Sequence, residues 1–229
     1  MPKRLILASN NAKKLRELQA LIAPLGIELV TQGSLGIPEA EEPHVTFVEN
    51  ALAKARRAAA LANGPALADD SGLCVDALGG APGVRSARHS VDAGRIAEGL
   101  PREQIDAANN AWLLTQMAGQ AQRGAHFTCL LVAVRHADDP EPLIAEGQWR
   151  GELLSAAQGE HGFGYDPLLW IPDQGHSAAQ LPPDIKNAIS HRALACARLL
   201  DMMRTRWGMA SGTPAASADA WPWQGDAAP

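Results

Sequence analysis

The beginning of the chain carries a strand, a helix and a second strand in direct succession, and this order restricts the fold more than any other feature. Residues 5–9 and 27–31 are apolar runs typical of buried strands. Between them, leucine and isoleucine recur at helical spacing, and Asn10 or Asn11 is available as the N-cap. Two strands joined by a helix open an α/β fold. The sequence therefore predicts helices packed on a sheet.

Later segments predict that this sheet is mixed. The strongest strand pattern, residues 127–135, is followed by residues 142–154 across a turn at 138–140, which predicts an antiparallel pair. Thr46 and Glu49 have the spacing of a capping box, so a helix is expected from there to about residue 62. Two more helices are expected over residues 102–118 and after Ser190.

The segment ADDSG, residues 68–72, places two carboxylates, a hydroxyl and a glycine at the end of a short apolar run. We expect the run to be a strand that enters a turn here, because each of these polar residues favours turns. Side chains alternate along a strand, so Asp69 and Asp70 should point to opposite faces and only one can face a given cleft. The segment is either turn chemistry alone or a carboxylate site for a hard divalent cation, with Gly72 allowing close approach.

Composition narrows the classes of function. With 229 residues and 46% hydrophobic residues, the chain can bury a substantial core. A net charge of -5 gives no general affinity for nucleic acid, so phosphate binding must be local. Three cysteines, distant from one another and in apolar surroundings, are typical of thiols in a reducing compartment. The apolar run near the amino terminus is too short for a signal or membrane segment, so we expect a cytoplasmic protein without a membrane partner.

Lys13 and Lys14 lie in the first turn of the first predicted helix, where the macrodipole disfavours cations unless an anion binds beside them. A strand, a polar loop and a helix N-terminus bearing lysine can bind phosphate. The alternative is that both side chains extend into solvent. Neither a P-loop nor a dinucleotide fingerprint is present in the sequence.

Two further segments carry candidate ligand contacts. The acidic loop before Thr46, residues 38–43, contains Glu41 and Glu42, which have no local structural role and are typical of a solvated loop. The glycine-rich segment around residues 159–166 places Phe163 between two glycines, where its ring either anchors the loop or stacks on a flat ligand. Both segments therefore become informative only together with the rest of the chain.

Six motifs occur in order between about residues 4 and 205: SNNAKK, the EE loop before TFVENA, ADDSG, LGGAPG followed by SAR, GFGYDP, and a lysine followed by SHR. Together they resemble the inosine triphosphate pyrophosphatase family, whose members are also called dITP/XTP pyrophosphatases. The resemblance implies an elongated mixed α/β sheet with flanking helices, two lobes around a central nucleotide-binding cleft, and a homodimer. It also implies magnesium-dependent hydrolysis of non-standard purine nucleoside triphosphates to monophosphate and pyrophosphate. Asn10 stands where the family usually has a glycine.

The same resemblance assigns residues by position. It implies that Asp70 is the proton acceptor, that Lys14 holds phosphate, and that Glu41 or Glu42 binds Mg²⁺ together with Asp70. Triphosphate contacts are implied at Ser9, Asn10, Asn11, Ala12, Lys13 and Lys14. Nucleotide and base contacts are implied at Ser71, Phe163, Gly164, Tyr165, Asp166, Lys186, His191 and Arg192.

Base selectivity has a physical basis. Hypoxanthine and xanthine present an acceptor at O6, whereas adenine presents an amino donor there. Arg192 or the His191 region donating to O6 would reject adenine. Guanine shares O6 and differs in its 2-amino group, and no residue could be assigned to its exclusion.

Two other functions fit parts of the sequence. A Maf-type nucleotide pyrophosphatase would share the early strand and helix, although GFGYDP and SHR fit it poorly. A nucleotide sensor without catalysis would not need Asp70 together with the acidic loop.

The domain organisation follows from where the apolar pattern ends. Residues 1–207 are expected to form one two-lobed domain. Residues 208–229, which contain Trp221 and Trp223 but show no apolar period, are expected to form a disordered tail.

Overall fold

The computed structural model describes residues 4–209. One mixed sheet has the strand order β2-β1-β3-β4-β5-β6-β7. Its strands are β1 (Arg4–Leu7), β2 (Glu28–Thr31), β3 (Ala66–Val75), β4 (Gly124–Val134), β5 (Leu143–Leu153), β6 (Leu169–Ile171) and β7 (His176–Ser177). The helices are α1 (Ala12–Ile22), α2 (Phe47–Ala62), α3 (His89–Asp92), α4 (Arg102–Gln116), α5 (Pro183–Ile189) and α6 (His191–Arg206). β1 is parallel to β2 and β3, and the remaining neighbours are antiparallel, which confirms the mixed sheet.

The predicted helix starts are confirmed by their caps. The Asn11 side chain accepts hydrogen bonds from the first turn of α1, and Thr46 accepts one from the Glu49 amide of α2. Ser190 caps α6 by accepting from the Ala193 amide. Local sequence therefore determines where these helices begin.

The expected turn at residues 68–72 is wrong. These residues lie inside the ten-residue strand β3, which pairs residue by residue with β4 from Ala66 opposite Val134 to Val75 opposite Ala125. The long antiparallel partner outweighs the turn preferences of aspartate, serine and glycine. Gly72 is needed for another reason: a Cβ there would lie 2.3 Å from the carbonyl oxygen of Gly83, at the start of the 3-10 helix η4 (Gly83–Arg88). The close approach predicted for this glycine is thus a contact with backbone.

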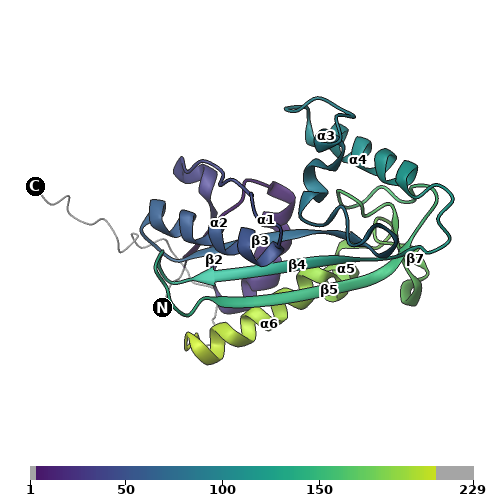
Figure 1. Ribbon diagram of the computed structural model, residues 1–229. Coiled ribbons are helices and arrows are strands. Elements are labelled where there is room, and N and C mark those ends of the chain that lie inside the picture. The colour runs from purple at the N-terminus through teal and green to yellow at the C-terminus, as the bar shows by residue number, and fades with distance from the viewer. Residues whose placement is uncertain (1–3, 210–229) are drawn as a thin grey trace, which may run out of the picture.

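The two lobes share the long strands β3, β4 and β5 (Figure 1). In one lobe α1 and α6 pack on one face of the sheet, with Leu18 and Leu199 against Leu131, and α2 packs its alanines on the other face. In the second lobe Leu113 of α4 packs with Phe127. The predicted fold class is therefore confirmed.

The predicted start of the tail is placed too early, because Met209 is buried in the core and its amide donates to the carbonyl oxygen of Met203. The rest of the predicted tail, residues 210–229, lies outside the described residues. Within residues 4–209, no helix has both the length and the apolar character that crossing a membrane requires.

Candidate active site

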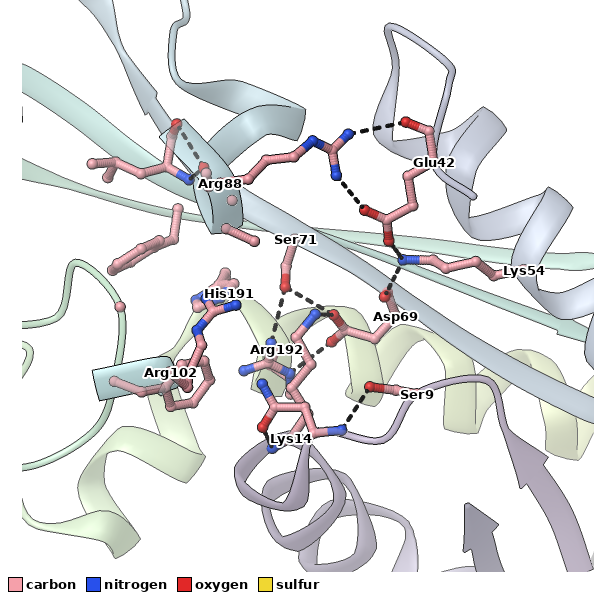
Figure 2. Close-up of a pocket in the computed structure, with 18 of the residues that line it drawn as sticks. Ser9, Lys14, Glu42, Lys54, Asp69, Ser71, Arg88, Arg102, His191 and Arg192 are labelled. Atoms are coloured by element: carbon pink, nitrogen blue, oxygen red, sulfur yellow. Dashed lines mark hydrogen bonds and ion pairs between the residues drawn. The ribbon is translucent and has the colours of Figure 1, made fainter. Parts of the chain in front are cut away.

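A cavity of about 390 Å³ lies where the elements of the two lobes meet (Figure 2). It is bounded by the start of α1, the acidic loop, β3, η4, α4, the glycine-rich loop and the start of α6. Of the predicted site residues, those that line it are Ser9, Asn11, Lys14, Glu41, Glu42, Ser71, Phe163, Gly164, Tyr165, Asp166, Lys186, His191 and Arg192. Those outside this lining, within the part of the chain that the structure describes, are Asn10, Ala12, Lys13 and Asp70.

The phosphate end of the cavity is formed by the loop before α1. Ser9 accepts a hydrogen bond from the Asn11 amide at 3.2 Å, and Asn11 Oδ1 accepts from the amides of Lys13 and Lys14 at 2.9 and 3.1 Å. Lys14 Nζ donates to Asp69 Oδ1 at 2.5 Å. Lys14 is thus anchored by a carboxylate inside the cavity and does not extend freely into solvent.

The predicted contacts outside the lining hold neighbouring loops. Asn10 Oδ1 accepts from the Gly33 amide at 2.9 Å, which ties this loop to the segment after β2. Lys13 Nζ donates to the carbonyl oxygen of Gly162 at 3.3 Å and lies 5.9 Å from the centre of the Phe163 ring. Lys13 therefore links the phosphate end to the glycine-rich loop.

Asp69 and Asp70 point to opposite sides of β3, as the strand alternation predicts. Asp69 lines the cavity, whereas Asp70 lies on the α2 side, where its Oδ1 accepts from Lys54 Nζ at 2.8 Å. Burial raises the pKa of Asp70 above its ordinary value, although the Lys54 ammonium opposes this. Oδ2 of Asp70 is buried and has no hydrogen-bond partner among the described residues.

Asp69 is the acceptor for several donors at once. Besides Lys14, Arg192 Nε donates to Oδ2 at 2.7 Å and the Ser71 hydroxyl donates to Oδ1 at 2.8 Å. Burial opposes ionisation, yet the charges of Arg192 and Lys14 hold the pKa of Asp69 well below its ordinary value. Asp69 is therefore an anion that positions two cations.

These ion pairs continue into a chain that crosses the cavity. Glu17 of α1 accepts from Arg192 Nη1 at 2.5 Å and from Lys186 Nζ at 3.5 Å. Lys186 also donates to Asp166 Oδ2 at 2.6 Å. The alternating charges run in the order Lys14, Asp69, Arg192, Glu17, Lys186 and Asp166. The chain fixes α1 relative to α5 and α6.

A second ion cluster joins the acidic loop to β3. Lys54 Nζ of α2 donates to Glu42 Oε1 at 2.6 Å as well as to Asp70. Arg88 donates to Glu42 Oε2 at 3.3 Å and to its carbonyl oxygen at 3.0 Å (Figure 2). Burial alone would lower the pKa of Lys54, but the charges of Asp70 and Glu42 have the larger effect and raise this pKa above its ordinary value. Glu41 is exposed at the edge of the same loop.

The cluster provides a test of whether a metal fits. Within residues 4–209, no group of three or more acidic, histidine or cysteine side chains is gathered as a metal site. However, Glu42 and Asp70 approach the same ammonium, and the free Oδ2 of Asp70 is a hard oxygen donor. Two carboxylates suit Mg²⁺, which keeps several waters and takes substrate phosphates as its other ligands.

The base end of the cavity is aromatic and cationic. The Phe163 ring has Lys186 Nζ at 5.2 Å and the Arg192 guanidinium at 5.9 Å from its centre. His191 stacks on Phe127, with centroids 4.8 Å apart. Burial holds the pKa of His191 well below its ordinary value, so the ring is neutral at neutral pH. The buried Nδ1 of His191 has no hydrogen-bond partner among residues 4–209.

Other predicted residues near the base end have structural contacts. The Tyr165 hydroxyl donates to the carbonyl oxygen of Ser86 at 3.2 Å, and Asp166 Oδ2 accepts from the Phe163 amide at 2.8 Å. A Cβ on Gly162 would lie 2.0 Å from that carboxylate oxygen, so glycine is required there. These contacts shape the loop that presents Phe163.

The sequence did not identify several residues of the site. Glu17 lies one helical turn after Lys14, a spacing that could have revealed it. Lys54 falls between Ala51 and Ala55 on the buried face of α2, where a lysine requires partners. Arg88 and Arg102 also line the cavity; Arg88 belongs to the SAR motif but received no role there, and Arg102 has no local sequence signal.

The fold and the site define a protein whose cleft suits a ligand with an anionic end and a flat ring. The chain belongs to the Ham1 family, whose sequence model matches residues 5–202. The resemblance expected from the motifs is therefore confirmed, and membership of this family decides against the Maf-type alternative.

Known relatives cover nearly the whole matched region. The chain is 61% identical over 211 residues to a protein of Leptothrix cholodnii named dITP/XTP pyrophosphatase, covering 90% of this chain and 100% of that protein. It is 63% identical over 205 residues to a Methylibium petroleiphilum protein of the same name, covering 89% and 99%. Among solved structures, it is similar to a HAM1 protein from Coxiella burnetii, with a TM-score of 0.78, 40% identity and coverage of 89% and 98%. The Staphylococcus aureus Ham1 protein gives a TM-score of 0.75 at 32% identity, with coverage of 89% and 99%.

Proposed function

We propose that this chain hydrolyses the non-standard purine nucleoside triphosphates ITP, dITP and XTP to monophosphate and pyrophosphate, removing them from the nucleotide pool. The observation that carries the proposal is one cavity that joins the Lys14 end to the Phe163 and His191 end. The Lys14 end suits phosphates, and the end with Phe163 and His191 suits a purine ring. The names of the similar proteins support the same reaction.

The residues of the phosphate end divide the chemistry between them. Lys14, fixed by Asp69, binds the departing pyrophosphate and stabilises its charge. Asp70 lies outside the cavity lining and shares the Lys54 ammonium with Glu42, and in the proposed reaction its carboxylate accepts or relays the proton of the attacking water. Of the two candidates Glu41 and Glu42, Glu42 would hold Mg²⁺ together with Asp70, because it shares the Lys54 ammonium with Asp70 whereas Glu41 is exposed. When bound, Mg²⁺ would neutralise phosphate charge and polarise the water.

Selectivity for the base comes from donors at O6. His191 is neutral, and with its proton on Nε2 it donates to the O6 acceptor of hypoxanthine or xanthine. Arg192 has each guanidinium nitrogen already bonded, to Asp69, Glu17 and Ser71. It retains further N–H groups for the ligand. Adenine would place its amino group against these donors, which a polar site can reject by on the order of 10⁴.

The first experiment mixes the purified protein and Mg²⁺ with inosine, xanthosine, guanosine and adenosine triphosphates and measures pyrophosphate and orthophosphate. We expect rapid pyrophosphate release from the first two and slow release from the others, because O6 donors and the cavity select them. Release of orthophosphate, or no product, would reject the proposal. Binding measured as a thermal shift without product would support the sensor alternative.

Removal of divalent metal provides a second test. We expect chelation with EDTA to abolish pyrophosphate release, because without Mg²⁺ the carboxylates of Glu42 and Asp70 repel the triphosphate and no metal polarises the attacking water. Added Mg²⁺ should restore the rate, while the thermal unfolding midpoint without nucleotide changes little, since Lys54 and Arg88 together already pair with Glu42 and Asp70. Full activity in EDTA would contradict a metal requirement.

The remaining parts of the proposal concern the surroundings of the enzyme. We infer a homodimer from the family resemblance, and a cytoplasmic location from the free cysteines and the nature of the substrate. The net charge of -5 supports a small anionic nucleotide held in a local pocket and not a nucleic acid.

A further inference from the structure

Three arginines line the cavity, and they differ in how many of their donors are already used. Arg192 is bonded at all three nitrogens, and Arg88 directs both terminal nitrogens to Glu42. Arg102 donates only from Nε, to Asp106 Oδ1 at 2.8 Å. Within residues 4–209, neither terminal nitrogen of Arg102 has a hydrogen-bond partner. Arg102 is therefore the cavity arginine with both terminal nitrogens available to a ligand.

The position of Arg102 is fixed relative to the loop that carries Phe163. Asp106 binds Arg102 through Oδ1 and accepts from the Gly164 amide through Oδ2 at 3.0 Å. Asn110, one turn later in α4, donates to the carbonyl oxygen of Gly164 at 3.0 Å. Helix α4 thus binds the amide and the carbonyl oxygen of Gly164 and also carries Arg102. The Phe163 ring, next to Gly164, and the Arg102 guanidinium are therefore fixed relative to each other at the cavity.

Arg102 lies at the base end of the cavity. In Figure 2 it is drawn on the same side as His191, away from Glu42 and Lys54. It comes from α4, whereas His191 comes from α6, so the two donors approach from different elements. Arg102 and His191 can therefore each contact a different position on the edge of the same purine ring.

We propose that Arg102 is a specificity-determining residue that contacts the 2-position of the purine and discriminates xanthine from guanine. The inference rests on the proposed function and addresses a discrimination that O6 donors cannot make. Xanthine has a carbonyl acceptor at this position, hypoxanthine has only hydrogen, and guanine has an amino donor. A guanidinium with free N–H groups binds the carbonyl and leaves a donor facing a donor with guanine.

A phosphate contact is the other use of a free arginine in such a cavity. A contact with phosphate would affect all triphosphates equally, because their phosphates are identical. Hypoxanthine provides the internal reference, since it has no polar group at the 2-position. The ratio of two substrates thus separates a role in base selection from a role in phosphate binding or loop support.

The test compares Arg102→Met, which keeps an apolar stem, with Arg102→Lys, which keeps a donor. Values of kcat/KM are measured for inosine, xanthosine and guanosine triphosphates. We expect Arg102→Met to lower the ratio of xanthosine to guanosine triphosphate by about 10- to 100-fold, as for loss of one charged hydrogen bond. Arg102→Lys should retain part of the preference. The control is Arg95→Met, because Arg95 packs 4.0 Å from the Trp112 ring and does not line the cavity.

An unchanged ratio in Arg102→Met would overturn the inference, and so would an equal loss on all three substrates. Calorimetric titration with the inosine, xanthosine and guanosine monophosphates measures the same discrimination without turnover. A wild-type protein that releases no pyrophosphate would reject the proposed function, while the titration would still decide whether Arg102 prefers xanthine. The two failures are therefore distinguishable.

Discussion

Asp70→Asn should lower the rate of pyrophosphate release from inosine triphosphate by about 10²- to 10⁴-fold, the range of a lost general base. The amide has the size of the carboxylate but cannot accept the proton of the attacking water, and it is a poorer ligand for Mg²⁺. Steady-state kinetics at saturating Mg²⁺ measures the effect. A rate close to that of the wild type would contradict the role of Asp70.

The fold should tolerate this substitution. Burial already makes the charged form of Asp70 unfavourable, and Lys54 keeps Glu42 and the carbonyl oxygen of Asp69 as acceptors at 2.6 and 3.0 Å. Thermal unfolding should therefore change little. A large loss of stability would mean that Asp70 is required for folding, and the kinetic result would then not identify its chemical role.

Asp69→Asn is the matched control, with the same chemical change one residue earlier on the opposite side of β3. Asp69 is 1% exposed and neutralises Lys14 and Arg192. Its substitution removes the negative charge that offsets Lys14 and Arg192, so both stability and activity should fall. The contrast between the two variants separates a reacting group from a group that positions cations.

The sequence predicted the alternation of these aspartates but placed them in a turn. The side chains of consecutive strand residues point to opposite faces wherever a strand exists, so this part required no tertiary information. The strand itself depends on β4, whose Leu131 and Leu130 pair with Asp69 and Asp70. That partner is distant in sequence, and local turn preference gave the wrong answer.

The site was predictable where its residues lie close to helix starts and loops. Lys14 and Ser190 could be located from first-turn and capping patterns. Glu42 was located only through the family resemblance, and Arg102, although it begins α4, has no local pattern that places it at the cavity. Lys54 is intermediate, since its place on the apolar stripe of α2 signals a buried charge but does not name Asp70 as its partner.

Arg192→Met should lower the free energy of unfolding by about 3–5 kcal/mol at neutral pH, because it removes the middle cation of a buried chain. Arg192 is 1% exposed, and its loss leaves Asp69 and Glu17 as poorly compensated anions. Denaturant unfolding of both proteins as a function of pH measures the difference.

The pH dependence of this difference has a definite sign. In the wild type, Arg192 and Lys14 hold the pKa of Asp69 well below its ordinary value of 3.8, so the ionised form contributes stability above that pH. The contribution is lost as the pH falls through the lowered pKa of the folded protein. The difference between wild type and Arg192→Met should therefore be greatest near neutral pH and shrink below about pH 4.

Arg192→Lys separates folding from base selection, because it keeps the cation beside Asp69 while removing the planar set of donors. If Arg192 donates to O6, the ratio of kcat/KM for inosine over adenosine triphosphate should narrow in this variant, while stability falls less than in Arg192→Met. An unchanged ratio in a folded Arg192→Lys protein would assign the O6 discrimination to His191. Equal stability of Arg192→Met and wild type would instead contradict the role of the ion-pair chain, because without Arg192 the buried Asp69 keeps Lys14 as its one ion-pair partner among residues 4–209.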